Sequence, residues 1–488
     1  MLDTTLNIGI PNSNTALNKK LSFPNDRKMK RQRDPSSSSK GPHANSRCQT
    51  GNDFYNEILH QDDDRDSIRV SWLRNRSIIN GNEGDNGMMS ISDSNGQSNE
   101  IRSLGQQLVQ VKRRLWPAAE QCARASGSTP SEEFWSARAF ANPMEALGEC
   151  RHGGLNQMFI NRSAIKLANI DAVLDFGLTR NPRGTTNGFG GREVFLFADL
   201  CGAPGGFSEY IMKRIRAKGT GCLCRGYGMS LVGQNEHGKG AKWRLEDFCE
   251  NDTTFSIDYK IHYGCDGTGD IYKWENATAF QRDIGRDLEE SGISQRKMNL
   301  VVADGGFDAQ RDSECQEGLA QKLILCELAV ALELLDLGGT LVVKLFGFQT
   351  DSIQMAMRSL YDFFDSMEMI KPISSRPASS ERYVVFTAFK GLPANWEGGQ
   401  SWISSILIGR CLRENLSFYS STVDAYLDQF DRDMLVLNLK ACFAILSHLE
   451  RKTTSMQLNR PTFGKRNLEN QRNNVNIKLY KHTWQLFI

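Results

Sequence analysis

The sequence lacks the cysteine and histidine spacing of a zinc module. Its 12 cysteines include no pair in the C-x-x-C spacing, and its 7 histidines are scattered along the chain. This usage is typical of reduced cysteines in the cytosol or nucleus, so we expect neither a metal site nor a disulfide framework. The sequence also shows no secretory signal before residue 30 and no run of 18 uncharged apolar residues, so we expect no membrane contact.

A strong net charge is missing as well. Lys and Arg number 59, Asp and Glu number 57, and the formal net charge is +2, so any basic surface must be local. Residues 1–100 are rich in Ser, Asn, Asp and Gly, which predicts a disordered N-terminal region. Within it, the basic cluster at 27–33 is typical of a nuclear import signal, and we therefore expect a nuclear location. A nucleic-acid-binding arm and an ordinary solvated charge run are the alternatives.

The glycine-rich turn of the chain lacks the dinucleotide-binding spacing G-x-G-x-x-G. Residues 197–207 read Phe-Ala-Asp-Leu-Cys-Gly-Ala-Pro-Gly-Gly-Phe, which is the end of a strand-like run, a turn and the start of a helical pattern. Such a turn brings backbone N–H groups and a helix N-terminus close to a ligand. No Asp or Glu occurs in residues 220–235, where a nicotinamide dinucleotide site needs one. The turn thus favours a smaller nucleoside ligand, such as S-adenosylmethionine, over a nicotinamide dinucleotide. A turn that merely joins a strand to a helix is the alternative.

Strand-like runs alternate with helical patterns from about residue 104 onward. The alternation predicts an α/β, Rossmann-like fold with a mostly parallel sheet and helices on both faces. The runs near 368–373 and at 383–389 follow each other closely, which predicts an antiparallel pair at one sheet edge. The remaining strands are expected at 194–199, 221–224, 257–263, 299–303 and 340–345, and the helices at 157–170, 207–216, 316–337, 351–364 and within 401–450.

Four charged residues stand where a buried core would not place them. Asp304 and Lys344 each end a buried-strand run, Glu381 precedes another, and Lys166 lies within a helical pattern. The carboxyl ends of parallel strands line the ligand crevice, so these side chains are expected to meet near the glycine turn. There Lys344 would act as the base toward a ribose hydroxyl, with its pKa lowered by burial and by Lys166, while the two carboxylates orient the amines. Ordinary exposed ends of secondary structure are the alternative.

The order of these four residues resembles the lysine–aspartate–lysine–glutamate tetrad of the FtsJ-like ribose 2'-O-methyltransferases. The flanking residues 159–171, 300–307 and 374–383 resemble the cap-specific mRNA (nucleoside-2'-O-)-methyltransferase 1 family, and the resemblance spans roughly residues 130–390. It implies an S-adenosylmethionine-dependent methyltransferase fold and methylation of the first transcribed nucleotide of 5'-capped mRNA or pre-mRNA. It also implies contact with the transcription machinery.

The resemblance further implies roles for individual residues. Asp270 and Ile271 would contact the adenine, and Arg138 and Asn161 would contact capped RNA together with Glu381. The S-adenosylmethionine site would be completed by Asp199, Cys201, Gly202, Ala203, Pro204, Gly205, Gly206 and Phe207.

The same resemblance implies a domain order. The FtsJ-like domain is expected at 104–395, a helical remnant of a guanylyltransferase-like region at 396–450 and a polar, basic tail at 451–488. Two other functions stay open. One is 2'-O-methylation of the second cap-proximal nucleotide or of another RNA, and the other is a catalytically silent RNA-binding protein that kept the fold.

Overall fold

The computed structural model describes residues 94–142, 159–180, 193–217, 222–232, 242–244, 256–306, 316–409 and 417–458. All of these residues belong to one compact unit. The basic cluster at 27–33 and the end of the chain from residue 459 lie outside the described residues.

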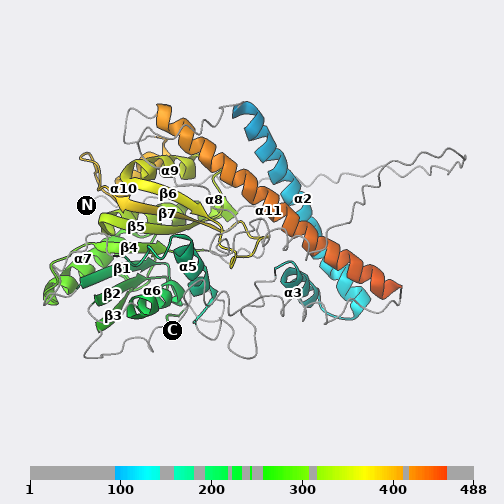
Figure 1. Cartoon of the computed structure of the whole chain (residues 1–488), viewed down its shortest axis with the longest axis horizontal. Helices are drawn as coiled ribbons and strands as arrows, with labels where there is room; N and C mark the ends of the chain where they lie inside the picture. Colours follow the sequence, from blue (N-terminus) through cyan, green and yellow to red (C-terminus); the bar gives the residue numbers. More distant parts are fainter. Residues whose placement is uncertain are drawn as a thin grey trace, which may run out of the picture. The chain divides into compact units, whose positions relative to one another are not determined.

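A seven-stranded sheet forms the centre of the described part of the chain (Figure 1). Its strand order is β3-β2-β1-β4-β5-β7-β6, and β7 runs antiparallel to both β5 and β6 while the other pairs are parallel. The expected fold class and the antiparallel edge pair are therefore confirmed. The strands are β1 (Glu193–Leu200), β2 (Cys222–Met229), β3 (Ser256–His262), β4 (Met298–Ala303), β5 (Leu335–Leu345), β6 (Phe364–Ile370) and β7 (Arg382–Phe389).

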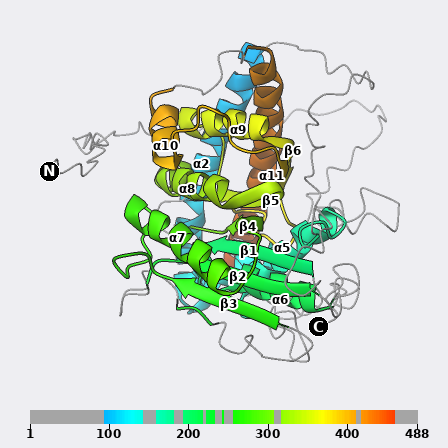
Figure 2. The same cartoon turned by 90° about the vertical axis from the view of Figure 1, so that its left-hand side faces the viewer.

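Helices cover both faces of this sheet (Figures 1 and 2). The apolar side chains of α5 and α6 pack on one face, and those of α7, α8, α9 and α10 pack on the other. These helices are α5 (Arg162–Val173), α6 (Gly206–Ala217), α7 (Trp274–Glu290), α8 (Gln316–Leu334), α9 (Asp351–Phe363) and α10 (Gly399–Leu407).

The sequence of β1 shows why the sheet is buried on both sides. Leu196 and Ala198 point into the cluster shared with α7 and α8, while Phe195 and Phe197 point into the cluster shared with α5 and α6. Successive side chains of a strand face opposite sides, so a strand covered on both faces is a continuous apolar run.

Three further helices flank the sheet domain: α2 (Ser94–Ser126), α3 (Pro130–Phe140) and α11 (Ser417–Gln457). Leu108 and Leu115 of α2 pack with Leu439 and Leu446 of α11 in a separate apolar cluster. Two expected limits need correction. Helix α2 begins at Ser94, inside the stretch 1–100 expected to be disordered, and α11 continues to Gln457, beyond residue 450. Helices α2, α3 and α7 had no counterpart in the sequence-based prediction.

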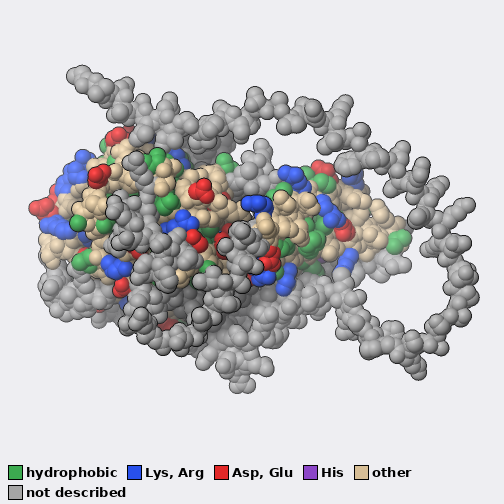
Figure 3. Space-filling model, turned by 90° about the horizontal axis from the view of Figure 1, so that it is seen from above, with side chains coloured by type: hydrophobic (Ala, Val, Ile, Leu, Met, Phe, Trp, Pro, Cys, Tyr) green, Lys and Arg blue, Asp and Glu red, His purple; other side chains and the backbone are tan. Residues whose placement is uncertain are grey.

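The surface of the described residues agrees with the small net charge. Lys and Arg side chains are interspersed with Asp and Glu side chains over the face shown in Figure 3. Among the described helices, none combines the length and apolarity needed to cross a membrane.

Candidate active site

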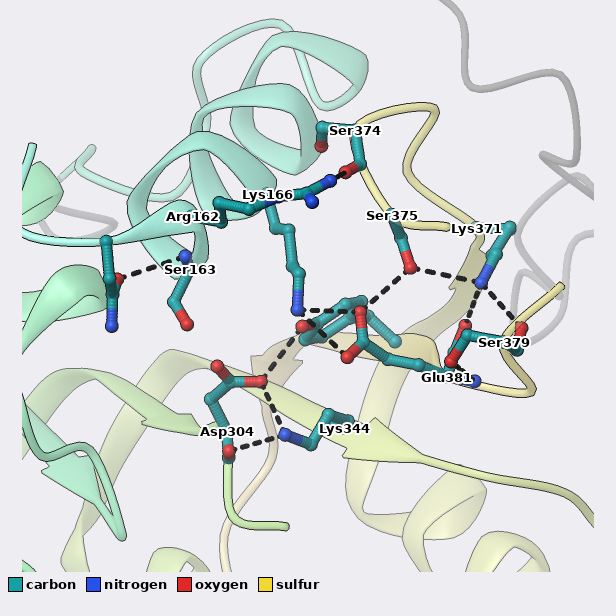
Figure 4. Close-up of polar contacts among 12 residues, drawn as sticks. Arg162, Ser163, Lys166, Asp304, Lys344, Lys371, Ser374, Ser375, Ser379 and Glu381 are labelled. Atoms are coloured by element: carbon teal, nitrogen blue, oxygen red, sulfur yellow. Dashed lines mark hydrogen bonds and ion pairs between the residues drawn. The ribbon is translucent and has the colours of Figure 1, made fainter. Parts of the chain in front are cut away.

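Three of the four expected residues meet at one edge of the sheet because β7 runs against β5. In this antiparallel pair Lys344 lies opposite Tyr383, so the start of β7 stands beside the end of β5, and Glu381 immediately precedes it. Asp304 follows the last residue of β4, the parallel neighbour of β5. Helix α5 covers this edge and supplies Lys166 (Figure 4).

The four side chains form two ion pairs. The Lys166 ammonium lies 2.9 Å from a carboxylate oxygen of Glu381, and the Lys344 ammonium lies 3.0 Å from Oδ1 of Asp304 (Figure 4). Lys344 also donates to the backbone oxygen of Asp304 at 2.7 Å. The four side chains are only 9% to 16% exposed, so both pairs are largely shielded from water.

The electrostatics of the two pairs differ from the expectation for Lys344. Burial lowers the pKa of the Lys344 ammonium, but the nearby carboxylates of Asp304 and Glu381 outweigh burial and raise this pKa above its ordinary value. The expectation of a lowered Lys344 pKa is therefore wrong for the protein without ligand, because these carboxylates outweigh the effect of burial. Burial raises the pKa of Glu381, but the ammonium groups of Lys166, Lys344 and Lys371 hold it well below its usual range.

The glycine turn joins β1 to α6 beside these pairs. Asp199, at the end of β1, is fully buried, and its Oδ2 accepts a hydrogen bond of 2.6 Å from the Ser208 hydroxyl in α6. A Cβ on Gly202 would lie 2.1 Å from Oδ1 of Asp199, so only glycine lets the turn pass over this carboxyl. Gly205 has a backbone φ of +107°, a value that residues other than glycine rarely adopt. Asp199 thus supports the turn through its close contact with Gly202 and its hydrogen bond to Ser208.

The turn and the loops beside it fit S-adenosylmethionine. The N-terminus of α6, at Gly206, offers positive backbone dipoles to the carboxylate of a methionine group. The amide of Val232 donates to the Thr268 carbonyl at 2.9 Å, and this bond brings the loop after β2 against the loop that contains Asp270. Leu231, Val232 and Tyr272 in these two loops are exposed apolar residues, 44%, 36% and 37% respectively, and apolar side chains suit contact with a nucleoside base.

Two residues expected at this site have side chains that are buried in the apolar core. The side chains of Phe207 and Ile271 are 1% and 4% exposed and pack in the two main apolar clusters. Asp270 is half-buried, and its Oδ1 accepts a hydrogen bond of 2.9 Å from the Tyr272 amide. The other expected residues of the turn, Cys201, Ala203 and Pro204, lie in it half-buried.

Besides Glu381, two residues were expected to contact RNA, and they lie at different helices. Asn161 caps the N-terminus of α5, where its Oδ1 accepts from the Ser163 amide at 3.0 Å. The Arg138 guanidinium, on α3, lies 4.3 Å from the centre of the Trp135 ring, and Arg376 lies over the same ring at 5.6 Å. Because Arg376 belongs to the loop before Glu381, this aromatic and basic group is connected to the ion-pair site.

Sequence reasoning missed several residues of the site. Tyr383 is fully buried and its hydroxyl donates to Oδ1 of Asp304 at 2.9 Å. Lys371 directly follows β6, so the rule that singled out charged residues at strand ends also applied to it. Glu327 of α8 is fully buried beneath Gly305, and nothing in the sequence distinguishes it from a surface residue of a helix.

Comparisons with known proteins agree with this geometry. Residues 159–389 match the family model of the FtsJ-like methyltransferases. The cap-specific mRNA (nucleoside-2'-O-)-methyltransferase 1 of Xenopus laevis is 34% identical over 278 residues, which are 55% of this chain and 30% of the relative. The human protein of the same name is 34% identical over 277 residues with the same coverage.

A third relative is named as an inactive protein. It is the inactive cap-specific mRNA (nucleoside-2'-O-)-methyltransferase 1B of Caenorhabditis briggsae, which is 32% identical over 273 residues, 53% of this chain and 29% of the relative. The chain spans about 30% of the length of these curated relatives. The sheet order and the two ion pairs agree with the family match, so residues 159–389 resemble an FtsJ-like methyltransferase domain in both sequence and fold.

Proposed function

We propose that the chain transfers the methyl group of S-adenosylmethionine to the ribose 2'-hydroxyl of the first transcribed nucleotide of capped mRNA. The observation that carries this proposal is the pairing of Lys166 with Glu381 and of Lys344 with Asp304 beside the glycine turn. A glycine turn alone would serve many ligands, whereas two lysines and two carboxylates in one shielded site suit removal of a proton from an alcohol. The 34% identity to cap-specific relatives supports the choice of RNA.

The chain's own residues divide the chemistry between them. S-adenosylmethionine supplies an electrophilic methyl group on a positively charged sulfur. Lys344 accepts the hydroxyl proton on Nζ as the new O–C bond forms and the S–C bond breaks, which leaves a neutral thioether. Lys166, held by Glu381, orients the attacking oxygen in this proposal. Asp304, which accepts a hydrogen bond from Tyr383, fixes the Lys344 ammonium.

Lys344 must lose its own proton before it can act as this base. Its pKa is raised in the protein without ligand, because Asp304 and Glu381 favour the cation. A bound sulfonium brings a like charge to the site, and like charges lower the pKa of an ammonium. Bound RNA also excludes the remaining water from the two ion pairs. The base is therefore expected to form only when both substrates are present.

A catalytically silent RNA-binding protein is the second candidate, and the inactive relative at 32% identity favours considering it. The closed geometry of both ion pairs argues for activity, since binding alone does not need Lys344 buried against Asp304. Methylation of the second nucleotide, or of another RNA, would use the same four residues. The nuclear location and an association with the transcription machinery form part of the proposal, and the basic cluster at 27–33 supports the former.

The deciding experiment supplies radiolabelled S-adenosylmethionine and three RNAs of one sequence: m7G-capped, unmethylated-capped and triphosphate-ended. Nuclease mapping then locates the labelled nucleotide. Label on the first nucleotide of capped RNA supports the proposal. Equal rates on all three RNAs, or label on the second nucleotide, would contradict it. Binding of capped RNA without any transfer would favour the silent protein.

A further inference from the structure

A buried lysine organises the loop that carries the catalytic carboxylate. We call residues 371–381, which connect β6 to β7, the catalytic loop. Lys371 opens this loop, is fully buried, and donates from Nζ to the Ser375 hydroxyl at 3.0 Å, to the Ser379 carbonyl at 2.9 Å and to the Glu381 carbonyl at 2.6 Å (Figure 4). The loop is therefore folded around one ammonium group.

Ser375 connects this ammonium to the catalytic carboxylate. Its hydroxyl accepts from Lys371 and donates its only proton to Oε1 of Glu381 at 2.9 Å. A hydroxyl that accepts from a cation becomes a stronger donor, so the bond to Glu381 gains strength. Glu381 is thus held through its side chain by Ser375 and through its backbone by Lys371.

The number of partners indicates the charge of Lys371. Burial lowers the pKa of Lys371 to about 7, opposed by the nearby carboxylate of Glu381. A neutral amine has two N–H donors, whereas three acceptors surround this nitrogen. The geometry is therefore that of the ammonium form.

Helix α11 holds the other side of the catalytic loop. The amide nitrogen of Asn438 donates to the carbonyls of Pro377 at 2.5 Å and Ser379 at 3.1 Å, and Asn438 is 1% exposed. The Ser379 carbonyl thus accepts from both Lys371 and Asn438. Next to the loop, Arg382 pairs with Asp431 of α11 in a contact that is almost fully buried.

We propose that Lys371 is a positioning residue for methyl transfer, which fixes the Glu381 carboxylate through Ser375 while Asn438 of α11 anchors the same loop. Glu381 in turn holds Lys166 at 2.9 Å, so the position of Lys166 depends on residues that do not touch it. This inference rests on the proposed function, since it assigns a role in that reaction.

The test compares Lys371→Met, Ser375→Ala and Asn438→Ala in the full-length protein. Each is expected to lower kcat on capped RNA by about 10–100-fold, while KM for S-adenosylmethionine changes little, because the defect lies in alignment. Ser375→Thr keeps the hydroxyl and is expected to restore most of the activity lost in Ser375→Ala. Lys297→Met is the matched control. Lys297 also donates to a backbone carbonyl, that of Glu333, but it precedes the start of β4, whereas the ion-pair site lies where β4 ends.

Hydrogen exchange of the catalytic loop keeps the inference testable without activity. The amides of residues 375–381 are expected to exchange faster in Lys371→Met and Asn438→Ala than in the wild type and in Lys297→Met. Unchanged exchange, or wild-type kcat in Lys371→Met and Ser375→Ala, would overturn the proposal. If Lys371→Met does not fold, the comparison of kcat between Ser375→Ala and Ser375→Thr tests the proposal. A wild type that methylates no RNA refutes the proposed function, and the exchange data then still decide whether Lys371 and Asn438 hold the loop.

Discussion

The substitution Glu327→Gln tests the electrostatics beneath the active site. Glu327 is fully buried on α8, and neither carboxyl oxygen has a well-formed hydrogen bond among the described residues, although the Cys201 thiol and the Gly305 amide lie against it. Burial raises the pKa of this carboxyl from 4.5 to about 8, opposed by Cys201 and Lys344. The group is therefore neutral in the folded protein at pH 7 and ionised in the unfolded chain.

The two pKa values set the size and sign of the effect. Between pH 4.5 and pH 8 the folded state holds a proton that the unfolded state has released, so the free energy of unfolding falls as the pH rises. At about 1.4 kcal/mol per pH unit, the penalty from Glu327 is roughly 3 kcal/mol at pH 7 and roughly 5 kcal/mol at pH 9. Glutamine has nearly the same shape and no charge, so Glu327→Gln removes this penalty. Its amide leaves unpaired donors that cost about 1–3 kcal/mol at every pH.

Urea unfolding, followed by circular dichroism at pH 5, 7 and 9, measures the difference in stability between Glu327→Gln and the wild type. The difference is expected to be near zero or slightly unfavourable at pH 5 and to move in favour of the variant by several kcal/mol at pH 9. Glu290→Gln, at the exposed end of α7, is the control and is expected to change stability little at any pH. If the difference in stability between Glu327→Gln and the wild type is the same at pH 5 and pH 9, the Glu327 carboxyl is not neutral in the folded protein.

Three other predictions follow from the site. Lys344→Ala is expected to abolish methyl transfer and leave donor binding intact, as measured by labelled transfer and calorimetry, and a variant with more than a few per cent of wild-type kcat would exclude Lys344 as the base. Gly205→Val is expected to prevent S-adenosylmethionine binding, because its φ of +107° and its place in the turn leave no room for a branched side chain, and unchanged affinity in a folded variant would remove the turn from the site. Removal of residues 1–93, which stops short of α2, is expected to leave transfer on capped RNA nearly unchanged and to reduce nuclear accumulation in fluorescence microscopy.

The residues that could be found from the sequence share one property. Asp304 and Lys344 are charged residues at the carboxyl ends of apolar runs, and in open α/β sheets these ends line the ligand crevice. The sheet order then brings them together, because β4 and β5 are parallel neighbours. Glu381 joins them since β7 begins where β5 ends. These contacts follow from topology, and the topology follows from the alternation of strands and helices.

Contacts that depend on packing could not be found in the same way. The pKa of Lys344 is raised because the carboxylates of Asp304 and Glu381 lie nearby, and no pattern in the sequence states which lysine pairs with which carboxylate. Helix α2 escaped prediction because its apolar stripe is narrow and is completed by α11, more than 300 residues later in the chain. Hydrophobic periodicity predicts a helix well only when the segment's own sequence contains the complete apolar face.

The flanking helices place a limit on what sequence similarity reveals about this site. The matched domain ends at residue 389, yet Asn438 of α11 and Lys371 of the catalytic loop donate to the same carbonyl, that of Ser379. The position of Glu381 therefore depends on α11, and α11 is itself packed along α2 from the other end of the described chain. Both flanks of the matched domain thus contribute to the geometry of the two ion pairs, so the proposed site depends on more of the chain than residues 159–389, which match the family model.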